Sequence, residues 1–238
     1  MHHAASTLKL PLAVAVLRAV EDGRLDLDTP LAVRARFASL ADGRPYEVTR
    51  DYDSDDQPWA RLGHSVPVWW LVERSLAHSS NLATNLLMDA VGLGAVNAVY
   101  DRVGATRSRL RRGIQDTRAG DAGLHNTATA ADLTAVVIAL LRHRLVSPAG
   151  ADRLERVLAR GRWRAALPAG FPPGTYVAHK PGWIDVCCHD FGVVRPVAET
   201  PFVLGVFTTT TLDEQAAHAV VAQAAAVVWE HRLTLAGE

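Results

Sequence analysis

Apolar residues in the first two thirds of the chain recur at the spacing of buried or amphipathic helices. Between Leu10 and Val20 nearly every position is apolar, which predicts a buried helix over 6–22, and Gly23 is suited to ending it. The same spacing predicts further helices over 68–76, 82–91, 95–103, 129–144 and 148–160. The first part of the chain is therefore expected to be helical.

The pattern changes after Pro172-Pro173-Gly174. Runs of β-branched and aromatic residues separated by turn residues predict three strands, Thr175–His179, Phe191–Arg195 and Phe202–Thr209. A helix rich in Ala and Val is expected to close the chain over Asp213–Leu233. We therefore expect an α+β fold, in which a helical part (residues 1–170) and a part with an antiparallel sheet and a closing helix (residues 171–238) form one unit.

Two stretches lack sustained periodicity and are expected to be loops. The segment from Asp26 to Pro67 is broken by Asp, Gly and Pro, and its acidic run Asp51–Asp56 is typical of a solvated loop. Residues 107–125 carry several arginines, which we expect to face solvent or to pin the loop. The sequence contains neither an internal repeat nor a low-complexity segment.

Composition narrows the possible partners. The chain has 238 residues, 49% of them apolar, and its 25 basic side chains balance 25 acidic ones, with a pI near 7.2. This balance gives no electrostatic reason to bind nucleic acid, and no apolar run reaches the roughly 18 residues that span a bilayer. We therefore expect neither a nucleic-acid partner nor a membrane partner.

Cys187 and Cys188 are the only cysteines, and they are adjacent. Neighbouring residues of a strand point to opposite faces, so a disulfide between them would be strained. His189 and Asp190 follow, but strand alternation leaves only Cys187 and His189 on one face, whereas zinc takes three or four protein ligands. We expect no disulfide, no metal and no cofactor.

Lysine is rare in this chain. Of the 25 basic residues only Lys9 and Lys180 are lysines, and the rest are arginines. An arginine stays protonated in a protein, whereas a buried lysine can lose its proton and act as a base. The two lysines are therefore candidates for chemistry.

Lys9 follows Ser6 in an S-x-x-K pattern at the start of the first predicted helix. Residues three apart lie on one helix face, so the lysine can take the proton whose removal makes a serine hydroxyl nucleophilic. The helix N-terminus adds backbone N–H groups for a developing oxyanion. Two other segments stand out: Ser79-Ser80-Asn81, between two apolar helices, and Lys180-Pro181-Gly182, at the end of the first predicted strand.

In order and spacing, these three segments resemble the S-x-x-K, S-D-N and K-T-G motifs of the penicillin-recognising serine hydrolases, and of class A β-lactamases in particular. The likeness extends to residues 78–87 and 189–192 and covers nearly the whole chain. It implies the β-lactamase/transpeptidase-like fold, with a helical part and an antiparallel sheet flanked by helices. It also implies small-molecule substrates: a β-lactam, an ester or a peptide.

The resemblance gives four residues a role in acylation. Ser6 would be the acylated nucleophile, and Lys9 would be its base or proton shuttle. Ser79 would pass the proton to the leaving nitrogen. Lys180 would hold Ser79 and the substrate carboxylate by its charge.

Four further residues are placed around the substrate or beside it by the same resemblance. Asn81 would hold the substrate amide and orient Lys9. At the strand, Gly182 and Trp183 would contact the substrate, and the Trp183 backbone N–H would join that of the nucleophile in the oxyanion hole. Asn85 is expected to be a buried structural hydrogen-bonding residue rather than a substrate contact.

Two features depart from the family pattern near the site. Pro181 replaces the K-T-G threonine, which removes a hydroxyl and a strand N–H, a change that an edge strand tolerates. Arg112–Thr117 resembles the loop that carries the family's deacylating glutamate, yet no Glu occurs from 101 to 150. Asp116 or Gln115 could position the water instead, although Asp116 also suits a loop-pinning contact with an arginine. Without a replacement, acylation would survive and deacylation would slow.

The start of the chain departs as well. Five residues precede Ser6, where the family has a helix and two strands, so we expect an N-terminally incomplete fold with Phe202–Thr209 as an exposed edge. Lys9 and the apolar run Leu10–Leu17 loosely resemble an export signal, but the run is short, contains a proline and lacks a small-residue cleavage site. We expect a cytoplasmic protein as the sequence is written, and an exported one if its natural start lies upstream.

Three functions are compatible with this sequence. The first is a class A β-lactamase-type serine hydrolase that is acylated by a β-lactam or related amide and hydrolyses it slowly. The second is an esterase or D-Ala-D-Ala-carboxypeptidase-like acyl hydrolase. The third is an inactive penicillin-binding module. The missing glutamate, Pro181 and the short N-terminus favour it, and the two lysines and the motif serines oppose it.

Overall fold

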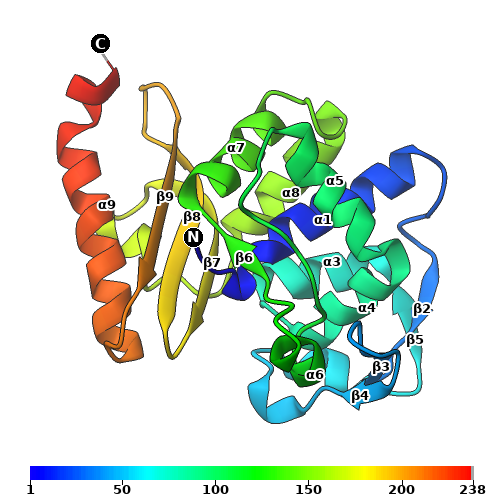
Figure 1. Cartoon of the computed structure of the whole chain (residues 1–238). Coiled ribbons are helices and arrows are strands. Elements are labelled where there is room, and N and C mark those ends of the chain that lie inside the picture. The colour runs from blue at the N-terminus through cyan, green and yellow to red at the C-terminus, as the bar shows by residue number, and fades with distance from the viewer. Residues whose placement is uncertain (237–238) are drawn as a thin grey trace.

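The computed structural model describes residues 1–236 and confirms the α+β class (Figure 1). A three-stranded antiparallel sheet lies between one long helix, α9 (Glu214–Ala236), and a larger helical part. The strands lie side by side in the order β7 (Tyr176–Ile184), β8 (Cys187–Arg195) and β9 (Phe202–Thr209). The order of elements along the chain is the one that the hydrophobic pattern predicts.

The first two strands are longer than predicted. The register pairs Ile184 with Cys187, so β7 and β8 form a tight hairpin, and Lys180 lies in the middle of β7 rather than at its end. The prediction was wrong because Pro181 and the following glycine have low strand propensity. Proline is tolerated here because β7 is an edge strand of the sheet and its second side faces no strand in the described range.

The helical part surrounds α1, the helix that follows Ser6. Ten residues of α1 from Lys9 to Ala19 are buried, and the helix contacts α3, α4 and α5. This agrees with the prediction of a buried helix. The helices of this part are α1 (Lys9–Glu21), α2 (Asp56–Trp59), α3 (Val68–Ala77), α4 (Asn81–Val91), α5 (Leu93–Arg102), α6 (Thr117–Asp121), α7 (Ala130–Leu141) and α8 (Pro148–Ala159).

Short elements connect the helices. Residues 107–125, predicted to be a loop throughout, contain the single turn of α6, which Asp116 caps by accepting a hydrogen bond from Ala119 N. The 3-10 turns are η1 (Ala5–Leu8), η2 (Arg50–Tyr52) and η3 (Leu167–Gly170). The short strand pairs are β1 (His2–His3) with β6 (Thr127–Ala128), β2 (Pro30–Ala32) with β5 (Ser65–Pro67), and β3 (Arg36–Ala38) with β4 (Pro45–Glu47).

The sheet has different neighbours on its two faces. Helix α9 covers one face and packs on η3, β8 and β9, while α7, α8 and η1 contact the other. The outer edge of β9 pairs with no other strand within residues 1–236, and both cysteines are buried free thiols. These contacts place η1, the turn that contains Ser6, directly against β7.

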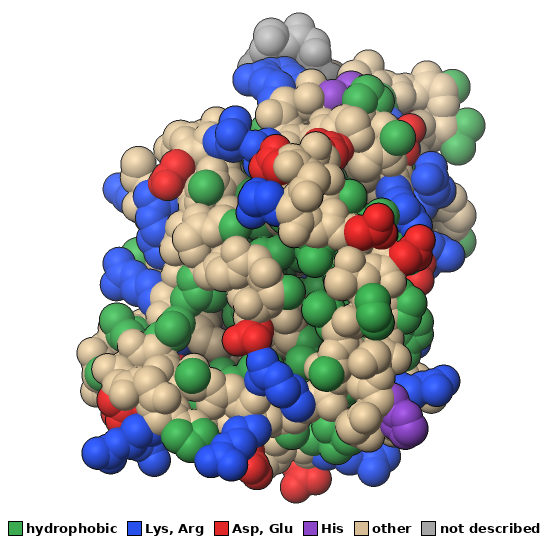
Figure 2. All heavy atoms as spheres, turned by 90° about the vertical axis from the view of Figure 1, so that its right-hand side faces the viewer, with side chains coloured by type: hydrophobic (Ala, Val, Ile, Leu, Met, Phe, Trp, Pro, Cys, Tyr) green, Lys and Arg blue, Asp and Glu red, His purple; other side chains and the backbone are tan. Residues whose placement is uncertain are grey.

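The surface carries both signs of charge. Figure 2 shows Lys and Arg side chains interspersed with Asp and Glu on one face of the molecule. In the described part of the chain, no single helix is long and apolar enough to cross a membrane, and the one consecutive pair that passes by composition, α4 with α5, is bent by 86°.

Candidate active site

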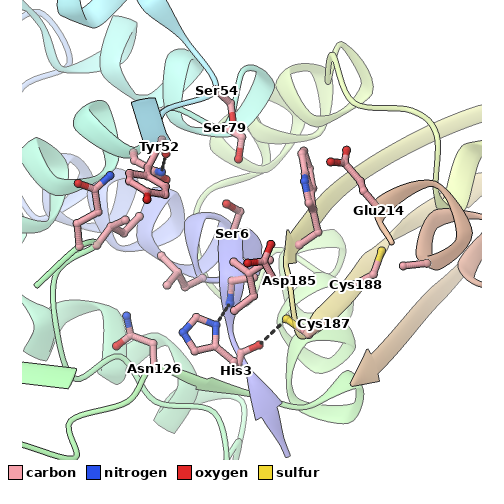
Figure 3. Close-up of a pocket in the computed structure, with 18 of the residues that line it drawn as sticks. His3, Ser6, Tyr52, Ser54, Ser79, Asn126, Asp185, Cys187, Cys188 and Glu214 are labelled. Atoms are coloured by element: carbon pink, nitrogen blue, oxygen red, sulfur yellow. Dashed lines mark hydrogen bonds between the residues drawn. The ribbon is translucent and has the colours of Figure 1, made fainter. Parts of the chain in front are cut away.

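A cavity of about 830 Å³ opens between the helical part and the β7–β8 hairpin. Figure 3 looks into it, with Ser6 near the centre and Ser79 above. Of the residues singled out from the sequence, Ser6, Ser79, Asn81, Gln115 and Trp183 line this cavity. Four predicted segments that are far apart in the sequence therefore meet at one place.

The turn that carries Ser6 is held in an unusual backbone conformation. Ala5 has a φ of 44°, in the left-handed region that residues with a Cβ rarely adopt. Gly182 of β7 lies against this turn, because a Cβ at that position would stand 2.7 Å from Ser6 N and 2.9 Å from Thr7 N. Only glycine allows β7 to approach the nucleophile turn this closely.

Two lysines converge on Ser79 from opposite sides. Lys9 Nζ donates to Ser79 Oγ at 3.1 Å, to Ser79 O at 2.6 Å and to Asn81 Oδ1 at 2.9 Å. Lys180 Nζ donates to the same Oγ at 3.2 Å and to Pro181 O at 2.8 Å. One residue or more from each motif, namely Lys9, Ser79, Asn81 and Lys180, thus form one hydrogen-bonded network, and Ser6 lines the same cavity as Ser79.

Burial changes the proton affinity of both amines. Lys9 is 0% and Lys180 1% exposed, and neither forms an ion pair with a carboxylate in residues 1–236. Burial, and then the charge of Lys180, lower the pKa of Lys9 well below its usual value, while Asp53 opposes the shift. Burial lowers the pKa of Lys180 to about 7, against an opposing contribution from Asp190. At neutral pH such amines can be unprotonated and can accept a proton.

Asp53 fixes the start of α4, which carries Asn81. Its carboxylate accepts hydrogen bonds from Asn81 N at 2.9 Å and Leu82 N at 2.8 Å, and a hydroxyl and an indole N–H also donate to it. Nearby, Asp55 is buried and paired with Arg74. The prediction of a solvated acidic loop is therefore wrong for these two residues, because Arg74 and the α4 residues that bind them lie about twenty or more positions away and leave no local pattern.

The loop before α6 keeps a fixed backbone at the cavity. Asn85 is buried, and its side chain accepts from Ile114 N at 2.8 Å and donates to Ile114 O at 2.9 Å, in line with the structural role expected for it. Ile114 lines the cavity, as does Gln115, whose Oε1 accepts a hydrogen bond from Thr49 N at 2.7 Å. The residues of this loop that reach the cavity are uncharged or basic, since the remaining two are Arg112 and Gly113.

Asp116 does not lie among the residues that line the cavity. It is 0% exposed, and its carboxylate accepts hydrogen bonds from Ser39 Oγ at 2.7 Å, Leu40 N at 3.0 Å and Ala119 N at 3.1 Å. The only arginine contact is to its backbone, where Arg112 donates to Asp116 O. Asp116 therefore pins the loop through neutral donors, a loop-pinning role with partners other than the arginine side chain that the sequence suggested.

Carboxylates do reach the cavity from other segments, namely Asp51, Asp53, Asp185, Asp213 and Glu214. Figure 3 shows Asp185 between Ser6 and Cys187, and Glu214 farther out, on the side of Cys188. Within residues 1–236 no group of three or more His, Cys, Asp or Glu side chains is arranged to hold a metal ion.

Two histidines close to the Ser6 turn have no role that the sequence predicts. The ring of His3 lines the cavity, and His189 of β8 contacts the backbone of His3. His189 was considered only as a metal ligand, because a lone histidine in a strand carries no local signal of a role. Their only signal is positional: His3 precedes Ser6 by three residues, and His189 follows the cysteine pair.

The profile of the β-lactamase enzyme family matches residues 1–232 of this chain. The chain belongs to the β-lactamase enzyme family. Among its relatives, extended-spectrum β-lactamase PER-1 of Pseudomonas aeruginosa is 24% identical over 242 residues, which cover 96% of this chain and 74% of the relative. A β-lactamase of Rhodobacter capsulatus is 26% identical over 87% of this chain and 67% of its own length.

Solved structures confirm a fold of the class A β-lactamase type. A variant of the ancestral class A β-lactamase of Gram-negative bacteria superposes with a TM-score of 0.83 at 28% identity, over 98% of this chain and 84% of that one. PBP-A superposes with a TM-score of 0.80 at 23% identity, over 97% and 81% of the two chains. A mutant of PBP-A with the same scores was solved as an acyl-enzyme complex with penicillin G.

Proposed function

We propose that this member of the β-lactamase family is a serine hydrolase that is acylated at Ser6 by a β-lactam or a related amide and that releases the acyl group slowly. The observation that carries the proposal is the pair of buried lysines on Ser79, beside Ser6. Burying two lysines without ion pairs is unfavourable for folding, so a role in proton transfer best explains their presence in one network.

Acylation would use Lys9 and Ser79 to move the proton of Ser6. Neutral Lys9 accepts the Ser6 Oγ proton as that oxygen attacks the substrate carbonyl carbon. The Ser6 N–H, which lies against β7, and the Trp183 N–H stabilise the oxyanion. As the C–N bond breaks, Ser79 Oγ donates its proton to the leaving nitrogen and regains one from Lys9, so the proton from Ser6 ends on the leaving group.

Substrate binding would use the remaining motif residues. Asn81 donates to Tyr52 O and accepts from Lys9, so its amide is fixed where a substrate amide can reach it. Lys180 holds Ser79 Oγ and offers a charge or a hydrogen bond to a substrate carboxylate. Pro181 supplies no hydroxyl at the neighbouring position, so carboxylate recognition rests on fewer groups.

The loop from 112 to 116 offers no carboxylate to act as the base in deacylation. The residues of the 112–115 loop at the cavity carry no carboxylate, and Asp116 is occupied by three structural donors. A positioned general base contributes about 10²–10⁴-fold to such a step. An acyl-enzyme on Ser6 is therefore expected to persist.

This persistence supports a second candidate, a D-Ala-D-Ala-carboxypeptidase-like acyl hydrolase or an esterase. A β-lactam, an ester and a peptide can all acylate the same serine, and they differ in the leaving group and in how fast the resulting acyl-enzyme is hydrolysed. A chain that is acylated and never loses the acyl group would act as a penicillin-binding module.

Intact-protein mass spectrometry after brief exposure to benzylpenicillin tests the proposal, with Ser6→Ala as the control. A mass increase equal to the whole drug, on the unmutated chain alone, is the expected result, followed by slow return to the starting mass. Rapid appearance of hydrolysed drug without an adduct would contradict slow deacylation. Neither an adduct nor hydrolysis in a folded chain would overturn the proposal.

A further inference from the structure

His189 links the sheet to the strand that leads to Ser6. Its Nδ1 accepts a hydrogen bond from Thr208 N at 3.2 Å, which leaves the ring proton on Nε2. Nε2 lies 2.9 Å from His3 O, and since a carbonyl can only accept, the imidazole donates. The ring is fully buried and stacks on Phe207, with centroids 4.5 Å apart. One neutral tautomer thus satisfies both contacts.

His3 continues this chain of hydrogen bonds toward the nucleophile. Its Nδ1 accepts from Ala5 N at 3.1 Å, so the ring again carries its proton on Nε2. Figure 3 shows the ring beside the cavity, with one hydrogen bond to the backbone of the Ser6 turn and the His3 carbonyl directed at Cys187. The bond reaches Ala5, the residue with the left-handed backbone.

These contacts join the two halves of the oxyanion hole. One half is Ser6 N, in the turn that follows Ala5, and the other is the N–H of Trp183 on β7. β7 is paired with β8, on which His189 opposes Gly182, the residue in closest approach to Ser6 N. A shift of His3 relative to β8 would therefore change the distance between the two donors.

We propose that His189 and His3 form a clamp that ties the strained turn before Ser6 to β8 and so sets the spacing of the oxyanion-hole donors. Both are positioning residues, and the inference rests on the proposed function. Burial lowers the pKa of His189 to about 4, and burial with the charges of Arg112 and His125 lowers that of His3, so both rings are neutral near pH 7, as the clamp requires.

Matched substitutions separate the hydrogen bond from the packing. His189→Gln keeps a donor for His3 O, whereas His189→Met fills the space without one. The rate of Ser6 acylation by an aryl ester is expected to fall by about 10- to 100-fold in H189M and to stay within about threefold of the unmutated chain in H189Q. His2→Leu is the comparison in the same strand, because the His2 ring contacts exposed Thr209 and the rings of His189 and Phe207 but takes no part in the hydrogen bonds of the clamp.

A second readout reports the oxyanion hole itself. A thionoester has sulfur in place of the carbonyl oxygen of the ester. An oxyanion hole with correctly spaced donors is therefore expected to give faster acylation by the ester than by the thionoester. H189M should lose most of this oxygen-over-sulfur preference while H189Q keeps it, which a change in overall stability would not produce. If H189M does not fold, the pair His3→Leu and His3→Asn repeats the test, since Asn retains an acceptor for Ala5 N.

The outcomes are distinguishable. An acylated wild-type chain in which H189M, or H3L, reacts as fast and discriminates as well as its conservative partner overturns the clamp alone. A wild-type chain without acylation at Ser6 overturns the proposed function and the catalytic role of the clamp with it. Nitrogen NMR of the two rings gives a check free of activity: an Nδ1–H tautomer for either histidine would also overturn the clamp.

Discussion

Two regions that line the cavity differ in how well their side chains suit the proposed reaction. On one side, Ser79 Oγ receives hydrogen bonds from both Lys9 and Lys180, and Ser6 lines the same cavity as Ser79. On the other side, Asn85 still fixes the backbone of Ile114 at the cavity, but the side chain it presents is apolar. The first region fits the proposed formation of an acyl-enzyme, whereas the loop from 112 to 115 brings no carboxylate to the cavity that could help to hydrolyse it.

The difference shows where burial serves function and where it serves folding. Lys9 and Lys180 are buried without ion pairs, which disfavours the folded state and is tolerated where the amines do chemistry. Asp116 is equally buried, but three donors satisfy its carboxylate, as a structural residue requires. The perturbed groups therefore mark the reactive side, and the satisfied carboxylate marks the structural one.

The largest effect is expected from substitutions of Lys9, in the network around Ser79. Lys9→Met should slow acylation of Ser6 by about 10³–10⁴-fold, because it removes the proton acceptor. Lys9→Arg should slow it nearly as much, since a guanidinium keeps the charge and cannot give up its proton. Stopped-flow acylation with nitrocefin measures both, and an active K9R chain would show that Lys9 acts by charge alone.

The next largest effect is expected from placing a carboxylate in the 112–115 loop. Ile114→Glu should speed deacylation by about 10- to 100-fold, because the Asn85 clamp holds that backbone at the cavity and a carboxylate there can activate water. Ile114→Gln is the matched neutral control and should leave the rate unchanged. The decay of the benzylpenicillin adduct, followed by intact mass, is the measurement. Equal decay in the two variants would show that this position does not reach the acyl carbon.

A smaller effect tests whether Asp116 is structural. Asp116→Asn replaces an acceptor of three hydrogen bonds with a group that can donate, so the free energy of unfolding should fall by about 1–3 kcal/mol. The rate of deacylation should change less than twofold. Urea denaturation and adduct decay give the two numbers, and a tenfold slower decay at unchanged stability would assign the water to Asp116 instead.

The last prediction concerns the pH dependence of stability and leaves the reaction itself aside. The pKa of Lys180 is about 7 in the folded chain and 10.5 ordinarily, so between these values the unfolded chain holds the proton that the folded chain has lost. Raising the pH from about 7 to 10 should therefore increase the stability of the wild type relative to Lys180→Met. Below about pH 6 the difference should be constant. Urea denaturation across this range checks it, and a flat difference throughout would contradict the burial-driven shift.

The sequence was informative wherever a residue type was unusual for the chain. Two lysines among so many arginines, and three motifs in order, predicted the reactive residues that the fold brings together. Hydrophobic spacing predicted the helices and the order of the strands, since burial of one face imposes a period. Strand length was missed at Pro181, where a long-range pairing overrides local propensity.

Contacts between distant segments were beyond the sequence. Asp53 caps a helix that begins 28 positions later, and Asp116 accepts a bond from a serine 77 positions earlier. The hydrogen bond from His189 to His3 spans 186 positions. None of these residues has a distinctive local pattern, so a carboxylate in a polar run could only be predicted to be solvated, and a lone histidine could not be assigned a role.

The central claim is that this chain forms the acyl-enzyme faster than it breaks it. The most direct test is rapid-mixing kinetics with nitrocefin at several protein concentrations. The account predicts a burst of about one product per chain, absent from Ser6→Ala, followed by a much slower steady rate. Linear turnover from the first measurement, with no burst, would contradict it.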